Sequence, residues 1–288
     1  MAKTMRVAAI QTSYGEDLKA NIAKTERFVR EAAGKGAQVV LPSELFQGPY
    51  FCTTQEEKWF ATAHEAATHP CVVAMAPVAK ELGVVIPVSI YERDGPLYYN
   101  SVVIVDADGK QLGVYRKSHI PEGPGYEEKF YFAPGDTGFI AWKTKVTTIG
   151  TLVCWDQWFP EGARLTAMQG AEILFYPTAI GWHPSERKQY GETQHDAWEV
   201  MQRSHAISNG CYVCVPNRIG HEIIKDAKGK PVDKDGIVFW GQSFVASPDG
   251  QVVKRAPVSK ETVLVVDCDL AKVEFSRTHW PSLRSMAG

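Results

Sequence analysis

The sequence contains no long apolar run and no excess of charge of either sign. None of its apolar stretches approaches the roughly 20 residues that a membrane-spanning helix requires. The formal net charge is −2 over 288 residues, which gives no global field that attracts nucleic acid or an anionic lipid surface. Low-complexity segments and internal repeats are also missing. We therefore expect a globular protein whose partner is a small molecule, with neither nucleic acid nor membrane as a partner.

Cysteine is scarce, with six residues in the chain. The apolar part of the first 13 residues is too short for a secretory signal, so we expect reduced thiols and a cytoplasmic location. Cys211 and Cys214 have the spacing of a redox motif, but positions three apart on a strand face opposite sides. Core packing is therefore the favoured interpretation of this pair.

The eight histidines form no H-x-H or H-x-x-x-H pair. This spacing gives no support to a metal centre, so we expect no metal and no other cofactor. A zinc hydrolase that uses histidines from one region of the chain is the rival mechanism. Those histidines are His183, His195 and His205.

One cysteine lies at a position typical of a reactive group. The apolar, β-branched run at 146–153 predicts a buried strand that ends at Cys154. Pro160 is suited to begin a helix, Gly170 to end it, and a second strand follows at 172–176. The carboxyl end of a strand beside a helix amino terminus is where α/β folds place reactive groups. Cys154 is therefore a candidate nucleophile, and the alternative is an inert cysteine of the core.

Two further functional groups follow apolar strands directly. Glu44 comes after a strand at 38–41, and Lys117 comes after a strand at 111–115. We expect both to meet Cys154 at the carboxyl edge of the sheets. A thiol, a carboxylate and an ammonium in one cleft supply a nucleophile, a proton shuttle and an anion stabiliser. The alternative is a core thiol, a surface carboxylate and a solvated lysine.

Strands and helices alternate along the chain. A helix capped by Asp17 separates the strand at 5–11 from the strand at 38–41, which predicts a parallel β-α-β unit. No linker divides the chain. We expect one α/β domain over residues 1–288, with two sheets packed face to face and helices outside each. The other predicted elements are strands at 84–90, 211–216 and 262–267, hairpins at 98–115 and 243–254, and helices at 56–65, 71–82, 160–169 and 193–209, with a loop at 178–192.

Three ordered motifs, PSELF at 42–46, YRKSHIP at 115–121 and CWDQWFPE at 154–161, resemble those of the nitrilase (carbon–nitrogen hydrolase) superfamily. The resemblance covers nearly the whole chain. It implies an αββα four-layer sandwich of two mixed sheets, no cofactor, and a homodimer or higher homo-oligomer. It also makes the helix at 160–169 and the tail from about residue 269, which includes Trp280, plausible parts of a subunit interface.

The resemblance implies roles for individual residues. The implied catalytic triad is Glu44, Lys117 and Cys154. A second family glutamate is best matched by Glu128, since the spacing fits its neighbour Glu127 less well. The thiolate attacks a carbonyl carbon, and Lys117 and the backbone N–H of Trp155 stabilise the oxyanion. His119, two residues after Lys117, is interpreted as structural, with a supporting role left open.

Within the superfamily, the motifs are most similar to those of members that hydrolyse the ureido group of N-carbamoylputrescine, a step in polyamine synthesis. Such a pocket needs aromatic walls and a group that binds the distal ammonium. The candidate walls are Tyr50, Trp158 and Trp182. His183 stands where these members carry an acid, so other nearby residues are also candidates. The candidates for the distal group are His183, Glu186, Glu192 and Asp196.

Other functions stay open. N-carbamoyl-β-alanine or another N-carbamoyl amino acid would need an arginine for its carboxylate. The arginines close enough in sequence are Arg187, Arg203 and Arg218. An aliphatic amide or a nitrile would use the same thioester chemistry. A catalytically silent binding or scaffold protein of this fold is the non-enzyme alternative.

Overall fold

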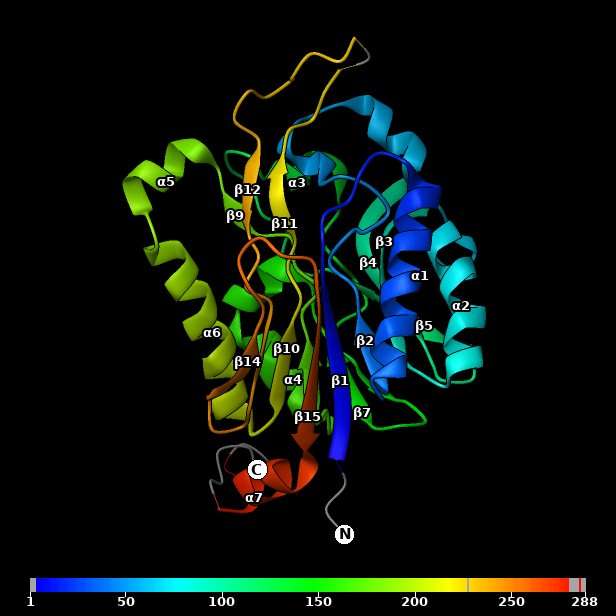
Figure 1. Ribbon diagram of the computed structural model, residues 1–288, viewed down its shortest axis with the longest axis vertical. Coiled ribbons are helices and arrows are strands. Elements are labelled where there is room, and N and C mark those ends of the chain that lie inside the picture. Colours follow the sequence, from blue (N-terminus) through cyan, green and yellow to red (C-terminus); the bar gives the residue numbers. More distant parts are fainter. Residues whose placement is uncertain (1–3, 227, 280–284, 286–288) are drawn as a thin grey trace.

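Two sheets lie face to face at the centre of the molecule, with helices outside them (Figure 1). The computed structural model describes residues 4–226, 228–279 and 285. The first sheet consists of two parts, β15-β1-β2 and β3-β4-β5, which a bridge between Val39 and Val85 joins. Its strands are β1 (Thr4–Gln11), β2 (Val39–Leu41), β3 (Ile86–Asp94), β4 (Leu97–Val105), β5 (Gln111–Arg116) and β15 (Thr262–Asp269).

The second sheet has six strands in the order β14-β13-β10-β8-β7-β6. The central strands β7, β8 and β10 are parallel, whereas the outer pairs are antiparallel. The first sheet is mixed in the same way, because β1 pairs with β2 in parallel and with β15 antiparallel. The strands of the second sheet are β6 (Ala141–Lys143), β7 (Thr148–Thr151), β8 (Ile173–Phe175), β10 (Tyr212–Val215), β13 (Phe244–Ala246) and β14 (Val252–Arg255).

Side chains of β1 alternate between two cores. Val7 and Ala9 belong to the cluster between the sheets, whereas Ala8 and Ile10 belong to the cluster under the outer helices. All four are fully buried, as expected for a strand covered on both faces. The helices are α1 (Leu18–Gly34) and α2 (Pro70–Leu82) on the first sheet, and α4 (Pro160–Met168) and α6 (Thr193–Asn209) on the second. The expected αββα four-layer sandwich is confirmed.

The helix boundaries follow from local chemistry. The side chain of Asp17 accepts hydrogen bonds from the backbone N–H groups of Lys19 and Ala20, at 2.9 and 3.2 Å, and so caps α1. Pro160 occupies the first turn of α4, where its missing N–H costs nothing. Both predicted helix starts are confirmed.

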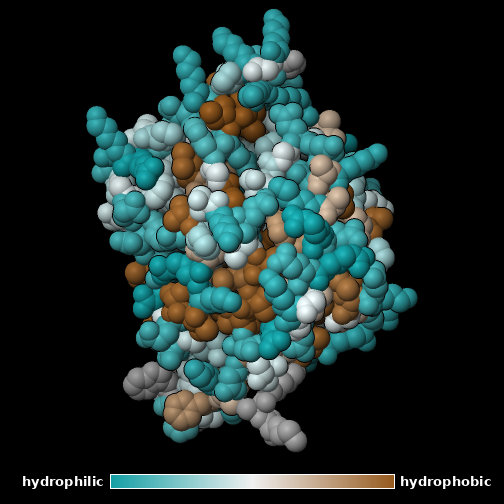
Figure 2. Space-filling model, in the orientation of Figure 1, coloured by the Kyte–Doolittle hydropathy of each residue, from teal (hydrophilic) through white to brown (hydrophobic). Residues whose placement is uncertain are grey.

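The outer strands β14 and β15 of the two sheets lie side by side on one side of the molecule. Figure 2 shows a band of apolar residues over these two strands, in the orientation of Figure 1. This side of the sandwich therefore exposes apolar surface.

A third sheet, β11-β12-β9, was not predicted. It lies beyond the ends of the two large sheets, at the top of Figure 1, beside the short helices α3 and α5. The prediction of a loop at 178–192 was wrong, because this segment contains β9 and α5. The segment 56–65, predicted as a helix, forms a 3-10 helix over Glu57–Thr62. The elements at this end are β9 (Gly181–Trp182), β11 (Ile219–Glu222), β12 (Ile237–Trp240), α3 (Glu128–Tyr131) and α5 (Pro184–Tyr190).

The last described helix is α7 (Leu270–His279). Trp280, expected at a subunit interface, lies outside the described residues. Within the described part of the chain, no helix has the length and apolar character needed to span a membrane.

Candidate active site

Cys154 lies just beyond the carboxyl end of β7 and opens a 3-10 turn over Cys154–Trp158. Its φ angle is +38°, in the left-handed region that non-glycine residues rarely adopt. The residue is only 3% exposed, and its backbone N–H donates to the carbonyl of Pro177 at 3.0 Å. Backbone strain of this kind is concentrated at functional sites. The turn takes the thiol out of the strand, as the sequence predicted.

Asp156 holds this turn, and the sequence reasoning missed it. One carboxylate oxygen accepts hydrogen bonds from the N–H of Val153 at 3.0 Å and the hydroxyl of Tyr115 at 2.7 Å. The other accepts from the N–H of His119 at 3.0 Å and lies 2.7 Å from its Nδ1. Because Tyr115 and His119 flank Lys117, Asp156 fixes the lysine segment against the cysteine turn. This contact agrees with the structural interpretation of His119.

The ammonium of Lys117 lies between two carboxylates. Its Nζ is 2.9 Å from Oε1 of Glu44, and 2.9 and 2.7 Å from Oε1 and Oε2 of Glu128. None of these three side chains is exposed to solvent. The amide of Asn100 also donates to Glu44 Oε1 at 2.7 Å, whereas Glu44 Oε2 is buried without a hydrogen-bond partner among the described residues. One oxygen of Glu44 is thus held, and the other is available for a proton.

The charges of this cluster determine the protonation of its members. Burial raises the pKa of the Cys154 thiol well above its ordinary value, the Glu44 carboxylate raises it further, and Lys117 lowers it. Burial alone lowers the pKa of Lys117, but Glu128 and Glu44 raise it well above its ordinary value. Burial raises the pKa of Glu128, against the opposing effect of Lys117. At neutral pH the lysine is therefore charged and the thiol is protonated, so the thiol needs a base in contact with it.

Tyr50, which the sequence analysis offered as a wall of the substrate pocket, is not among the lining residues of the cavity described below. Its hydroxyl donates to Oε1 of Glu128 at 2.6 Å, and its backbone N–H donates to Oε2 of Glu222 at 2.7 Å. Both Tyr50 and Glu128 are fully buried. Tyr50 therefore supports the carboxylate beside Lys117.

Arg218, a candidate for binding a substrate carboxylate, is fully buried under the Glu44 segment. Its guanidinium donates to the carbonyls of Glu44 at 2.9 Å, Leu45 at 2.7 Å and Gly48 at 3.0 Å. Glu222 neutralises it at 3.0 Å. The contacts hold Leu45 at a φ of +49° and so fix the backbone that carries Glu44. This role makes Arg218 unsuitable as a substrate-binding group.

A cavity of about 240 Å³ lies beside the cysteine turn. Trp155, Trp158 and Glu186 line it, and two of these, Trp158 and Glu186, are residues that the sequence analysis offered as substrate contacts. Sequence reasoning missed Tyr126 and Trp240, because no periodicity marks a loop aromatic or the last residue of a short strand as a wall. The other lining residues are Pro121, Glu122, Gly123, Pro124, Ile180, Gly181, Gln194 and Ala197.

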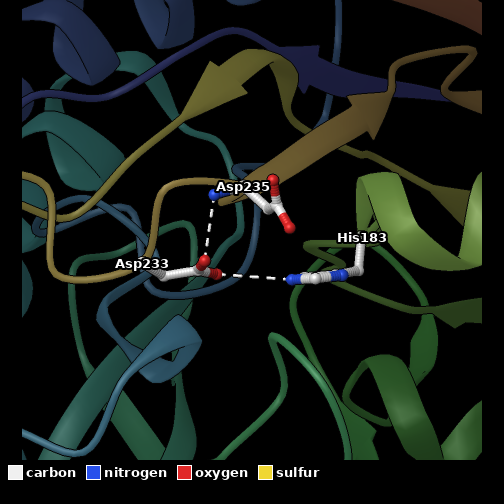
Figure 3. Close-up of side chains that lie close together, drawn as sticks. All are labelled: His183, Asp233 and Asp235. Atoms are coloured by element: carbon white, nitrogen blue, oxygen red, sulfur yellow. Dashed lines mark hydrogen bonds and ion pairs between the residues drawn. The ribbon is translucent and has the colours of Figure 1, made fainter.

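Three other residues that the sequence analysis offered as substrate contacts are not among the lining residues of this cavity. Trp182 packs on Trp240 with a centroid distance of 5.6 Å and donates its indole N–H to the carbonyl of Gly191. His183 points toward Asp233, with Nε2 3.4 Å from the carboxylate (Figure 3). Glu192 is exposed and directly precedes α6. Trp182 and His183 lie in and directly after β9, and α5 follows, so these two unpredicted elements set the directions of both side chains.

The three histidines of the rival zinc mechanism are not brought together. Among the described residues, the set close enough to hold a metal ion is His183, Asp233 and Asp235 (Figure 3). The Nε2–H of His205 donates to the backbone carbonyl of Gln157 at 2.7 Å, and His195 packs between aromatic rings.

A larger cavity, of about 570 Å³, lies between α6, the turn after β13 and α7. Ile207, Lys272 and Phe275 are among its lining residues. Cys154 itself lines neither cavity, but Trp155 and Trp158 of its turn line the smaller one, whereas no residue of that turn lines the larger one. The smaller cavity beside Cys154 is therefore the candidate substrate site.

The fold and this cluster together define the class: a hydrolase of carbon–nitrogen bonds. The chain belongs to the carbon-nitrogen hydrolase family, whose sequence pattern matches residues 6–278. It is 48% identical over 278 residues to an N-carbamoylputrescine amidase of Arabidopsis thaliana, covering 96% of this chain and 91% of the relative. A potato (Solanum tuberosum) protein of the same name is 50% identical, covering 96% and 90%.

Two further comparisons extend this relation. A citrullinase of Francisella tularensis is 39% identical over 280 residues, covering 97% of this chain and 94% of the relative. A crystal structure of a carbon-nitrogen hydrolase from Helicobacter pylori G27 superposes with a TM-score of 0.90 at 38% identity, covering 98% of this chain and 95% of that one. The family resemblance and the four-layer fold are both confirmed.

Proposed function

We propose that this chain hydrolyses the ureido group of N-carbamoylputrescine to putrescine, carbon dioxide and ammonia. The observation that supports this substrate most directly is the cavity beside Cys154: its charged lining residues are both carboxylates, Glu122 and Glu186, and its walls are aromatic. A four-carbon chain that ends in an ammonium fits such a lining. Four plant relatives at 47–50% identity carry the name N-carbamoylputrescine amidase.

The first chemical step uses the free oxygen of Glu44. Oε2 takes the proton from the Cys154 sulfur, and the thiolate attacks the ureido carbon. The carbonyl oxygen gains a negative charge, which the Lys117 ammonium and the backbone N–H of Trp155 stabilise. When the tetrahedral intermediate collapses, the bond to the unsubstituted nitrogen breaks, and ammonia leaves with the proton from Glu44. The product of this step is a thioester on Cys154.

The second step reverses the proton movements. Glu44 removes a proton from water, which attacks the thioester carbon, and the C–S bond breaks. The sulfur then takes the proton from Glu44. The released carbamate decomposes to amine and carbon dioxide. Glu128 acts through Lys117, because its two oxygens hold the ammonium at 2.9 and 2.7 Å.

N-carbamoylputrescine should be hydrolysed with a kcat/KM at least about 100-fold higher than that of N-carbamoyl-β-alanine, because like charges brought together cost several kcal/mol. The carboxylate of N-carbamoyl-β-alanine would meet Glu122 and Glu186, and neither Arg187 nor Arg203 lines the cavity. Arg187 lies over the Trp182 ring at 4.4 Å, and Arg203 donates to the carbonyl of Gly250. Ammonia release from both ureido compounds measures the preference, and faster hydrolysis of the carbamoyl amino acid would contradict it.

A ureido amino acid is the second candidate substrate, since the citrullinase relative is 39% identical. Its carboxylate would also need a basic group in the cavity. The comparison above, extended to citrulline, therefore tests both candidates.

We also propose a homodimer or a higher homo-oligomer and a cytoplasmic location. Leu165 and Met168 of α4 are 47% and 44% exposed, as an uncovered interface helix would be. The single-domain organisation stays a prediction.

A further inference from the structure

The two carboxylates of the cavity have different surroundings. Glu122 forms an ion pair with Lys129 at 2.9 Å, and both side chains are more than half exposed. Glu186 is half-buried, and among the residues that the structure describes no ion pair or hydrogen bond engages its carboxylate. We propose that Glu186 is the residue that binds the distal ammonium of the substrate, an inference that rests on the proposed function.

Glu186 is attached to a firmly held piece of backbone. It lies in the first turn of α5, and its N–H donates to the carbonyl of His183 at 2.9 Å. The ring of His183 is fixed on both nitrogens, since Nδ1 lies 2.6 Å from the hydroxyl of Ser185 and Nε2 faces Asp233 (Figure 3). Asp233 in turn accepts from the N–H groups of Asp235 and Gly236, which directly precede β12. The start of α5 is therefore tied to the β11–β12 hairpin.

Tyr126 relates Glu186 to the reacting groups. Its hydroxyl donates to the carbonyl of Gly181 at 2.8 Å and accepts from the N–H of the same residue at 2.9 Å. Burial raises the pKa of Tyr126, and the charges of Cys154, Glu186 and Glu44 each raise it further. Tyr126 lines the cavity together with Glu186 and with Trp155, which follows Cys154 in the chain. A substrate whose carbonyl is at Cys154 would extend past this ring toward Glu186.

The aromatic rings between the two ends favour the same ligand. Trp155 and Trp158 belong to the cysteine turn, and Trp240 ends β12. All three line the cavity together with Glu186. Methylene groups pack on such rings, and a nearby ammonium gains cation–π attraction of about 0.5–2 kcal/mol. The carboxylate of Glu186 supplies the negative charge that neutralises the substrate ammonium, which the uncharged rings cannot do.

The test compares Glu186→Gln with Glu122→Gln on two substrates, N-carbamoylputrescine and its uncharged analogue N-butylurea. Glu186→Gln should lower kcat/KM for N-carbamoylputrescine by about 30-fold, mainly through KM, because a charge-assisted hydrogen bond is lost. Its kcat/KM for N-butylurea should equal that of the wild type, which also shows that the variant is folded. Glu122→Gln should lower kcat/KM for N-carbamoylputrescine by no more than about threefold, because solvent and Lys129 screen the charge of this exposed carboxylate.

Each alternative outcome overturns a definite statement. If Glu186→Gln leaves the ratio of the two kcat/KM values unchanged, or if Glu122→Gln lowers that ratio equally, Glu186 is not the specificity residue. If the wild type does not hydrolyse N-carbamoylputrescine, the proposed function itself fails. Failure of the proposed function is seen with the wild type alone, whereas failure of the Glu186 proposal is seen only with the variants, so the two results can be told apart.

Discussion

Replacing Cys154 by alanine should lower kcat for ureido hydrolysis by about 100,000-fold or more, the effect expected when a covalent nucleophile is removed. The thioester cannot form without the sulfur, and the charged neighbours cannot replace it. The fold should persist, because alanine keeps the Cβ at the strained turn and the lost sulfur costs about 1 kcal/mol. Single-turnover kinetics measures the loss, and unfolding in urea checks the stability.

Cys52 provides a matched control for this variant. It is also fully buried, burial likewise raises the pKa of its thiol well above the ordinary value, and the charges of Glu128, Lys117 and Glu44 act on it as well. Yet it lies in a 3-10 turn over Phe51–Thr53 rather than at the end of a parallel strand. Cys52→Ala should therefore keep its activity. Loss of activity in Cys52→Ala with retention in Cys154→Ala would show that the nucleophile has been misassigned.

Replacing Lys117 by methionine should lower kcat by about 1,000-fold, since the main cation facing the oxyanion is lost. It should also lower the free energy of unfolding by about 3–5 kcal/mol, because two buried carboxylates lose their common counter-ion. Both Glu44 and Glu128 have unexposed side chains. Lys117→Arg, which keeps the charge, should retain most of the stability but lose activity through altered geometry.

The stability of Lys117→Met should depend on pH more steeply than that of the wild type. Burial already raises the pKa of Glu128 above its unfolded value, and Lys117 opposes that effect. Without the lysine, the pKa of Glu128 rises further. A carboxyl group with a raised folded-state pKa contributes stability that is complete below its unfolded pKa of about 4.3 and is lost as the pH rises.

Urea unfolding between pH 5 and pH 8, a range that spans the titration of a carboxyl with a raised pKa, measures this slope. The methionine variant should be weakest at the alkaline end, and Lys117→Arg should follow the wild type. Parallel curves for Lys117→Met and the wild type would mean that the lysine does not neutralise the two carboxylates.

The charged centre was predictable because it obeys a rule of topology. Glu44, Lys117 and Cys154 each follow a strand, and the packed sheets bring these strand ends to one place. Lys117 Nζ and Glu44 Oε1 are 2.9 Å apart although 73 positions separate the residues. The capped start of α1 at Asp17 was predictable for a similar reason, since it depends on a few adjacent residues.

The supporting residues were not predictable, because a buried charge has the same sequence signal as a surface charge. Arg218 and Asp156 are almost completely buried and fix the segments of Glu44 and Cys154. Nothing in their neighbourhood distinguishes them from solvated residues. The residues that line the cavity were hard to predict for another reason. The strand β9 has only two residues, and residues 223–236 separate β11 from β12. Periodicity cannot identify elements that short or pair strands across a loop that long.

The most direct test of the central claim is to identify the covalent intermediate. A reaction with N-carbamoylputrescine is quenched with acid during the first turnover, digested, and analysed by mass spectrometry. The account predicts an adduct on the peptide that contains Cys154, and none on the peptides of the other five cysteines. An adduct at a different cysteine, or turnover without any adduct at Cys154, would contradict the account.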